Sequence, residues 1–165
     1  MARPEGRAPN PRQGRALSLV VDAGIVAKWF VAEELTAEAD RLRPLVGRLA
    51  APDFCLIELA NILWKKARQG TLRPEEAGAI TPLLQRSGMR FLPSGPLLGD
   101  ALELACELDH PVYDCLYVAA MDVLGAPLVT WDKPLHAKLK ASRHGASVYL
   151  LSEVERLLAD LEAGS

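Results

Sequence analysis

Four acidic residues stand at places from which a fold can aim them into one cleft: Asp22, Glu58, Asp114 and Asp132. The first and last of them come shortly after apolar runs that predict buried strands. The other two lie within apolar segments that have helical spacing. Residues that follow the strands of an open parallel sheet gather at its carboxyl edge, where ligands bind. We therefore expect two acids at this edge and two acids that face it from helices.

Each acid also has a structural explanation. Asp22 and Asp132 can both act as N-caps, since a side-chain oxygen there accepts hydrogen bonds from the first turn of the following helix. Asp114 lies in the first turn of a predicted helix, where the helix dipole favours a negative charge. For Glu58 the structural alternative is a solvent-facing stripe on an amphipathic helix, but its neighbours are almost all apolar and a buried carboxylate needs a partner. Asn61 lies three residues later on the same helical face, so the pair predicts a polar pocket.

Four carboxylates in one cleft repel one another, and without a cation some of them would bind protons. Mg²⁺, with Mn²⁺ as the alternative, relieves this repulsion, because it binds a few carboxylates and keeps several water molecules. A metal-bound water has a lowered pKa and attacks a phosphodiester, while the ion stabilises charge on the phosphoryl oxygens. The Thr130 hydroxyl is expected at the same edge, where it can orient Asp132 or the water. The pattern predicts metal-dependent phosphodiester hydrolysis.

The elements that must position these residues alternate between short apolar runs and longer helical segments. We predict four strands, at residues 17–21, 89–92, 127–130 and 148–151. We predict helices at residues 25–31, 36–49, from 52 or 53 to about 70, 74–85, 97–108, 112–124, 134–141 and from the N-cap Ser152 onward. Such alternation predicts an α/β fold, a three-layer α/β/α sandwich with a short parallel sheet, in one domain that spans residues 17–161.

Length and composition are consistent with one domain, because the chain has 165 residues and half of them are hydrophobic. The formal net charge of −2 gives no overall basic field for nucleic acid, although a local basic stripe can serve. The three cysteines are typical of core residues in a reducing compartment. No apolar run approaches the roughly 18 residues of a membrane span, so we expect a cytoplasmic protein. Residues 1–16, with four arginines and three prolines, predict a disordered tail.

Taken in order, several motifs resemble those of a known family. They are Val20-Val21-Asp22-Ala23, Lys28-Trp29-Phe30, Pro52-Asp53 with Glu58 and Asn61, Tyr113-Asp114-Cys115-Leu116-Tyr117, and Thr130-Trp131-Asp132-Lys133. Together they resemble a PIN-domain protein, and more narrowly a VapC-type toxin of a bacterial toxin–antitoxin pair, over about residues 17–151. The resemblance implies a Rossmann-like fold and a Mg²⁺-dependent endoribonuclease that forms a homodimer. It also implies a cognate antitoxin that wraps the protein and blocks the cleft.

The resemblance assigns roles to individual positions. It implies that the four acids are catalytic, that Asp22, Asp114 and Asp132 bind the metal, and that Asn61 and Thr130 support them. One position departs from the family pattern: members commonly have Ser or Thr two residues after the first Asp, where this chain has Gly24.

Cations are needed to bind RNA phosphates. The cluster beside the last acid consists of Lys133, Lys138, Lys140 and Arg143. Further candidates on earlier segments are Lys28, Lys65, Lys66 and Arg68. A solvated helix face is the alternative interpretation of the first cluster. We assign no catalytic role to His136 or His144, and His110 is interpreted as a loop residue.

Other functions fit the sequence less well. A nucleotide-binding Rossmann enzyme needs a glycine-rich phosphate loop after the first strand, and here Gly24 stands alone. A phosphatase with an aspartyl nucleophile would have a second acid at this same position. Two alternatives stay open: a catalytically inactive interaction module of the same fold, and another metal-dependent phosphodiesterase or nuclease that acts on DNA.

Overall fold

The computed structural model describes residues 18–163, so the tail predicted at residues 1–16 lies outside the described part. Within it the chain forms a parallel sheet with the strand order β3-β2-β1-β4-β5. The strands are β1 (Leu19–Val21), β2 (Leu49–Pro52), β3 (Arg90–Leu92), β4 (Leu128–Thr130) and β5 (Val148–Leu150). From β1 the chain continues to β2 and β3 on one side of β1. It then returns to form β4 on the opposite side of β1, so the strand order reverses between β1 and β4. Ligands of open α/β sheets bind at such a switch point.

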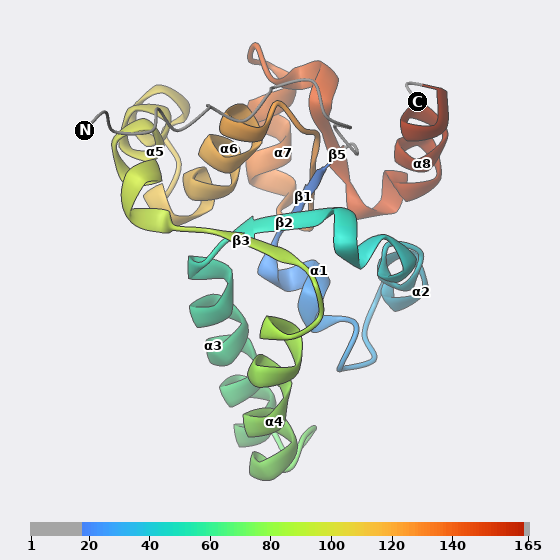
Figure 1. The fold of residues 1–165 in the computed structure, drawn as a ribbon. Helices are drawn as coiled ribbons and strands as arrows, with labels where there is room; N and C mark the ends of the chain where they lie inside the picture. The colour runs from blue at the N-terminus through green and yellow to red at the C-terminus, as the bar shows by residue number, and fades with distance from the viewer. Residues whose placement is uncertain (1–17, 164–165) are drawn as a thin grey trace, which may run out of the picture.

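Helices cover both faces of this sheet. They are α1 (Ala23–Ala27), α2 (Thr36–Asp40), α3 (Phe54–Arg68), α4 (Pro74–Gln85), α5 (Ser94–Leu108), α6 (Val112–Leu124), α7 (Lys133–Lys140) and α8 (Val154–Ala163), with short 3₁₀ helices η1 (Arg43–Arg48), η2 (Gly145–Ser147) and η3 (Leu151–Glu153). Figure 1 shows α5, α6 and α7 on one side of the sheet and α1, α3 and α4 on the other. Right-handed crossovers require this division, because the chain moves across the sheet in opposite directions in its two halves. The predicted three-layer α/β/α sandwich is confirmed.

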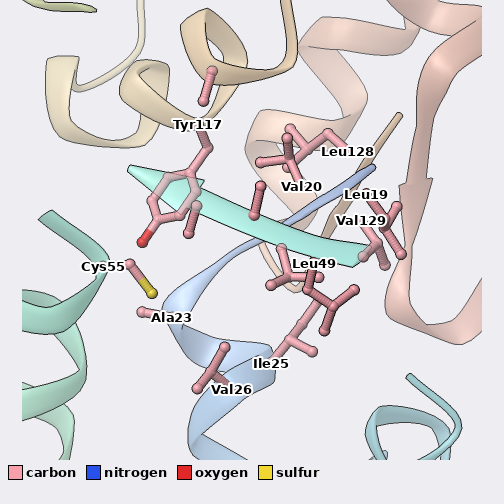
Figure 2. Close-up of a cluster of buried hydrophobic side chains, with 14 of the residues drawn as sticks. Leu19, Val20, Ala23, Ile25, Val26, Leu49, Cys55, Tyr117, Leu128 and Val129 are labelled. Atoms are coloured by element: carbon pink, nitrogen blue, oxygen red, sulfur yellow. The ribbon is translucent and has the colours of Figure 1, made fainter. Parts of the chain in front are cut away.

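The hydrophobic core fills the space between the sheet and the two helix layers. Every residue of β1, β2 and β4 is buried, as expected for parallel strands covered on both faces. Figure 2 shows strand side chains beside Ile25 and Val26 of α1, and Tyr117 of α6 with its hydroxyl toward Cys55 of α3. The core therefore joins both helix layers to the central strands. Within residues 18–163, no helix combines the length and the apolar composition that crossing a membrane requires.

The sequence pattern does not predict strand β2. The helix expected at residues 36–49 is wrong, because this segment forms α2 and η1 and then enters the sheet at Leu49. The strand sequence Leu-Ala-Ala-Pro contains no β-branched or aromatic residue, so its local preference does not favour a strand. Pairing on both sides decides the outcome, with Leu49 opposite Leu19 and Ala51 opposite Phe91. Pro52 is tolerated because it ends the strand.

Several helix starts also differ from the expected ones, and α5 begins at Ser94, three residues before the predicted start. Helix α1 begins at Ala23, directly after its N-cap Asp22, and it ends earlier than predicted. Ser152 does not cap the last helix, because it lies inside η3. The Glu153 carboxylate accepts a hydrogen bond from the Leu150 N–H at 2.8 Å instead, and α8 follows from Val154.

Substitutions of two valines on helix α6 test how much the packing of this helix against the sheet contributes to stability. Val118 is fully buried and Val123 is 58% exposed. Val118→Ala removes two buried methyl groups and leaves a small void, so we expect it to lower the free energy of unfolding by about 2 kcal/mol. Val123→Ala is the matched control on the same helix and should change it by less than about 0.5 kcal/mol. Urea unfolding of both variants measures the difference, and equal effects would contradict the packing described here.

Candidate active site

Asp22 joins the ends of the two strands at the switch point. One of its oxygens, Oδ1, accepts a hydrogen bond from the Ile25 N–H at 2.9 Å and so caps α1. The other, Oδ2, accepts from the Thr130 hydroxyl and from the Trp131 N–H, both at 2.6 Å. The residue therefore caps a helix and also faces the site. Thr130 was expected to orient Asp132, and its hydroxyl oxygen does accept the Asp132 N–H at 3.0 Å, but its own proton goes to Asp22.

Gly24 lies beside the same carboxylate. A Cβ at this position would lie 3.4 Å from Asp22 Oδ1 and 3.5 Å from Trp131 Cδ1, which are ordinary van der Waals contacts. The hydroxyl that the resemblance leads us to expect at position 24 is absent, and Thr130 supplies a hydroxyl to the other oxygen of Asp22. The departure at position 24 therefore does not leave Asp22 without orienting donors.

Asp114 and Asp132 meet at a histidine. Asp132 caps α7 through Oδ1, which accepts from the Leu135 N–H at 2.8 Å, while its Oδ2 lies 3.6 Å from His110 Nε2. Asp114 occupies the first turn of α6, and its Oδ2 lies 3.2 Å from the same nitrogen. This contact of His110 was not predicted, because the sequence indicates only a loop residue there. The available signal was its spacing of four residues from Asp114 across a helix start.

Glu58 faces the same cavity from helix α3. Its Oε2 accepts a hydrogen bond from the hydroxyl of Tyr117, a buried residue one turn after Asp114 on α6. Tyr117, which the sequence presents only as the last residue of the motif around Asp114, packs in the core and also holds an acid. Burial raises the pKa of Glu58 to about 7, although the hydrogen bond from Tyr117 opposes this shift.

The four acids line one cavity of about 200 Å³, together with Thr130, Trp131 and Tyr117. Asn61 does not line it and is exposed. The helical turn places Asn61 on the outer face of α3 with Ile57 and Trp64, which are 64% and 52% exposed, whereas Ile62 takes the inner position. The structure therefore unites Glu58 with the other acids but separates it from Asn61.

The predicted cation cluster is dispersed. Lys138 donates to the Asp109 carbonyl, and Lys140 donates to the Gly145 carbonyl at 2.7 Å. Arg143 pairs with Asp122 at 3.7 Å and lines a separate cavity at the amino-terminal edge of β4, away from the acids. Lys133, next to Asp132, is exposed and is the member of the cluster best placed to meet a substrate.

Lys28 is a structural cation and not an exposed phosphate contact. It is only 3% exposed, pairs with Glu33 at 3.3 Å and lies 3.9 Å from the ring centre of Trp131. Lys66 of α3 pairs with the same Glu33. Lys28 holds Trp131, and with it the backbone donor that binds Asp22, next to the end of α1, and Glu33 links Lys28 to Lys66 of α3.

Burial and mutual repulsion destabilise the charged forms of the acids in this cavity. Burial raises the pKa of Asp22 in spite of its three hydrogen bonds. Burial also raises the pKa of Asp114, followed by repulsion from Asp132, and the neighbouring His110 opposes both effects. A divalent cation would relieve this repulsion, and carboxylate oxygens are the ligands that Mg²⁺ prefers. The donor set at this edge therefore fits a hard divalent cation.

The raised pKa of Glu58 predicts a pH dependence of stability in metal-free protein. The folded protein keeps this proton up to a pH of about 7, whereas the unfolded chain loses it near 4.5, so the free energy of unfolding falls as the pH rises through this window. Glu58→Gln should flatten this fall and be more stable than the wild type above pH 7. Urea titrations in a chelator at several pH values measure the effect. Glu162→Gln, an exposed acid on α8, should keep the wild-type profile.

The substitution Asp114→Asn distinguishes two roles of this residue, that of a metal ligand and that of a structural cap. It removes a charge that repels Asp132, so the metal-free melting temperature should stay the same or rise. Saturating Mg²⁺ should raise the melting temperature of the wild type, and this rise should be smaller in the variant, because a ligand stabilises a folded protein only as far as it binds to it. Thermal melting with and without Mg²⁺ measures both effects. A large loss of metal-free stability would show that Asp114 mainly stabilises the start of α6.

Comparison with known proteins agrees with this geometry. The family model described as PIN domain matches residues 19–140, which include all four acids. Ribonuclease VapC3 of Pyrobaculum aerophilum is 35% identical over 127 residues, which cover 76% of this chain and 97% of that protein. Exonuclease VapC9 of the same organism is 31% identical over 129 residues, which cover 78% of this chain and 89% of the relative.

Solved structures have the same fold. The crystal structure of PAE2754 from Pyrobaculum aerophilum superposes with a TM-score of 0.66 at 27% identity, over 90% of this chain and 97% of that one. Mycobacterium tuberculosis VapC20, described as a toxin that cleaves the sarcin–ricin loop, superposes with a TM-score of 0.57 at 19% identity, over 73% and 94% of the two chains. The second likeness bears on the fold alone. From the family match and the two VapC relatives, the chain belongs to the PIN-domain family, among its VapC-type members.

Proposed function

We propose that this protein is a Mg²⁺-dependent endoribonuclease and the toxin of a type II toxin–antitoxin pair. One observation carries the proposal: Asp22, Glu58, Asp114 and Asp132, which lie far apart in the sequence, line one cavity at the switch point of the sheet. The relatives named ribonuclease and exonuclease support phosphodiester hydrolysis as the reaction. The substrate is cytoplasmic RNA.

Each side chain at the site has its own role in this proposal. Asp114 and Asp132, with Asp22, would hold a divalent ion that lowers the pKa of a bound water and stabilises charge on the phosphoryl oxygens. Glu58, with its pKa of about 7, is suited to exchange a proton with water or substrate at neutral pH. Tyr117 fixes the direction of the Glu58 carboxylate through its hydroxyl. Lys133 is positioned to meet a phosphate outside the cavity.

A cognate antitoxin and a second copy of the chain are the proposed protein partners. The VapC names of the relatives support this part of the proposal. Large apolar side chains on the surface also support it, because exposed apolar area marks protein contacts. Ile57 and Trp64 on α3, Leu83 on α4, and Leu98 and Leu102 on α5 are each more than half exposed.

A second candidate function is cleavage from a chain end, or cleavage of DNA. The name of the relative VapC9, an exonuclease, favours this alternative. The cavity geometry serves both reactions, because the metal chemistry at a phosphodiester is the same. The two functions differ in whether the substrate needs a free end, and a closed substrate therefore separates them.

A circular single-stranded RNA tests the proposal, because it has no ends. We expect the purified protein to open it in Mg²⁺ and to leave circular single-stranded DNA intact. Asp22→Asn and Asp114→Asn should each lower the rate by at least about 10²-fold, because each removes charge from the reacting centre. Asp100→Asn, the same substitution at an exposed site on α5, should keep the wild-type rate.

Gel analysis of the products, with circular dichroism to verify folding, gives the readout. Cleavage that survives both site substitutions would refute the proposed centre. Digestion of linear RNA but not of circular RNA would replace the endonuclease by an exonuclease. Opening of circular DNA would change the substrate to DNA.

A further inference from the structure

We propose that His110 is a direct ligand of the metal ion, together with Asp114 and Asp132, and that it makes the centre prefer a first-row transition ion such as Mn²⁺ to Mg²⁺. The inference rests on the metal centre of the proposed function and specifies its chemistry. An imidazole nitrogen is added to the carboxylate oxygens in the ligand set that the acids alone suggest.

The spacing of the three ligand atoms fits one ion. One nitrogen of His110 and one oxygen from each of Asp114 and Asp132 all lie within 4.8 Å of one another. His110 Nε2 is 3.2 Å from Asp114 Oδ2 and 3.6 Å from Asp132 Oδ2. Neighbouring ligands of an octahedral ion, each about 2.1 Å from the metal, are about 3 Å apart. The observed separations therefore need only small side-chain adjustments to close around an ion.

The Nε2 atom of His110 is buried beside two carboxylates. The His110 side chain is 7% exposed, and Nε2 is fully enclosed yet makes no hydrogen bond to any residue that the structure describes. Both neighbouring carboxylates are close to it, but neither meets hydrogen-bond geometry. Buried polar atoms are nearly always hydrogen-bonded, so each exception calls for an explanation such as an ion. A metal bound among the three residues supplies the missing partner.

The backbone holds His110 in place from both sides. Its N–H donates to the Ala105 carbonyl at 3.1 Å, at the end of α5, and Pro111 then leads into α6. The preceding residue, Asp109, makes the sharp turn in the left-handed region with φ of 49°. The imidazole is therefore presented from the corner between two packed helices, which gives a ligand a fixed direction.

Asp22 is less available as a direct ligand than the sequence suggests. Its two oxygens already accept three hydrogen bonds from the protein, from Ile25, Thr130 and Trp131. Asp132 uses only Oδ1 for its cap, and Asp114 lies in the first turn of α6 with Oδ2 turned toward His110 at 3.2 Å. The least committed oxygens are therefore the ones that face His110.

The nitrogen ligand has a consequence for metal choice. Carboxylates and water suit both Mg²⁺ and Mn²⁺, whereas an imidazole nitrogen binds a transition ion more strongly than it binds Mg²⁺. We therefore expect tighter binding of Mn²⁺ than of Mg²⁺, and we expect His110 to be the cause of the difference.

Pulsed electron paramagnetic resonance of bound Mn²⁺ tests the proposal without reference to activity. The chain has three histidines, so labelling histidine with ¹⁵N marks few nitrogens. We expect ¹⁴N coupling to Mn²⁺ in unlabelled protein, its replacement by ¹⁵N coupling after labelling, and its loss in His110→Asn. His136→Asn is the matched control, because His136 also has an enclosed Nε2 beside a carboxylate, 3.2 Å from Glu153, but lies outside the proposed centre. The control should keep the coupling.

Calorimetric titration supplies the second readout. His110→Asn should weaken Mn²⁺ binding by about 10-fold or more and Mg²⁺ binding by less than about threefold. Mn²⁺ that binds the wild type without histidine coupling would overturn the proposal, and this result does not depend on any variant folding. Tighter binding of both ions by His110→Asn would overturn it as well, since His110 would then be a cation that competes with the metal.

The outcomes also distinguish this inference from the proposed function. Opening of circular RNA in Mg²⁺ without histidine coupling to Mn²⁺ would leave the ribonuclease in place and remove only the histidine ligand. A protein that binds neither ion and cleaves nothing would remove both.

Discussion

The contact on which this site depends is the one between the Asp22 carboxylate and the end of strand β4. The strand order reverses between β1 and β4, so their chain connections lead away to opposite sides of the sheet. Asp22, just after β1, links the two strand ends because its Oδ2 accepts hydrogen bonds from the Thr130 hydroxyl and the Trp131 N–H. The first of these donors lies on β4 itself and the second directly follows it. The same carboxylate caps α1, so strand ends and helix start are held by one side chain. The position of Asp132 follows, since it comes next along the chain.

Around this contact the protein concentrates negative charge where water is scarce. The pKa values of Asp22, Glu58 and Asp114 are all raised, and burial is the largest cause in each case. Such an arrangement weakens the fold at neutral and higher pH when no cation is present. It is typical of functional sites, where stability is given up for a prepared electrostatic environment. A bound cation relieves this repulsion, and the relief contributes to the free energy of cation binding.

The chain also shows how a family site tolerates change at one position. Gly24 lacks the hydroxyl expected of family members, and Asp22 is nevertheless held by three donors, one of which is the Thr130 hydroxyl. Trp131, which supplies one of these donors, is itself fixed by the buried Lys28 beneath its ring and by the ion pairs of Lys28 and Lys66 with Glu33. Support for the first acid thus comes from β4, α1 and α3 together.

The sequence alone determined the alternation of strands and helices, and with it the layered fold and the gathering of four acids at one sheet edge. These features follow from local periodicity and from the rule that parallel strands end on the same side. Local patterns could not reveal strand β2, because Leu-Ala-Ala-Pro has little intrinsic preference for a strand and becomes one by pairing with both neighbours. Asn61 shares a helical face with Glu58 only approximately, and packing decided which of the two turned inward.

Tertiary structure alone decided the partners of the acids. The sequence places His110 in a loop and Tyr117 at the end of a motif, and neither position predicts a contact with an acid. The packing of α5 against α6 brings the imidazole of His110 to Asp114 and Asp132, and the packing of α6 across from α3 brings the Tyr117 hydroxyl to Glu58. Contacts between residues far apart in sequence depend on how whole elements pack, and this information is not contained in any single segment.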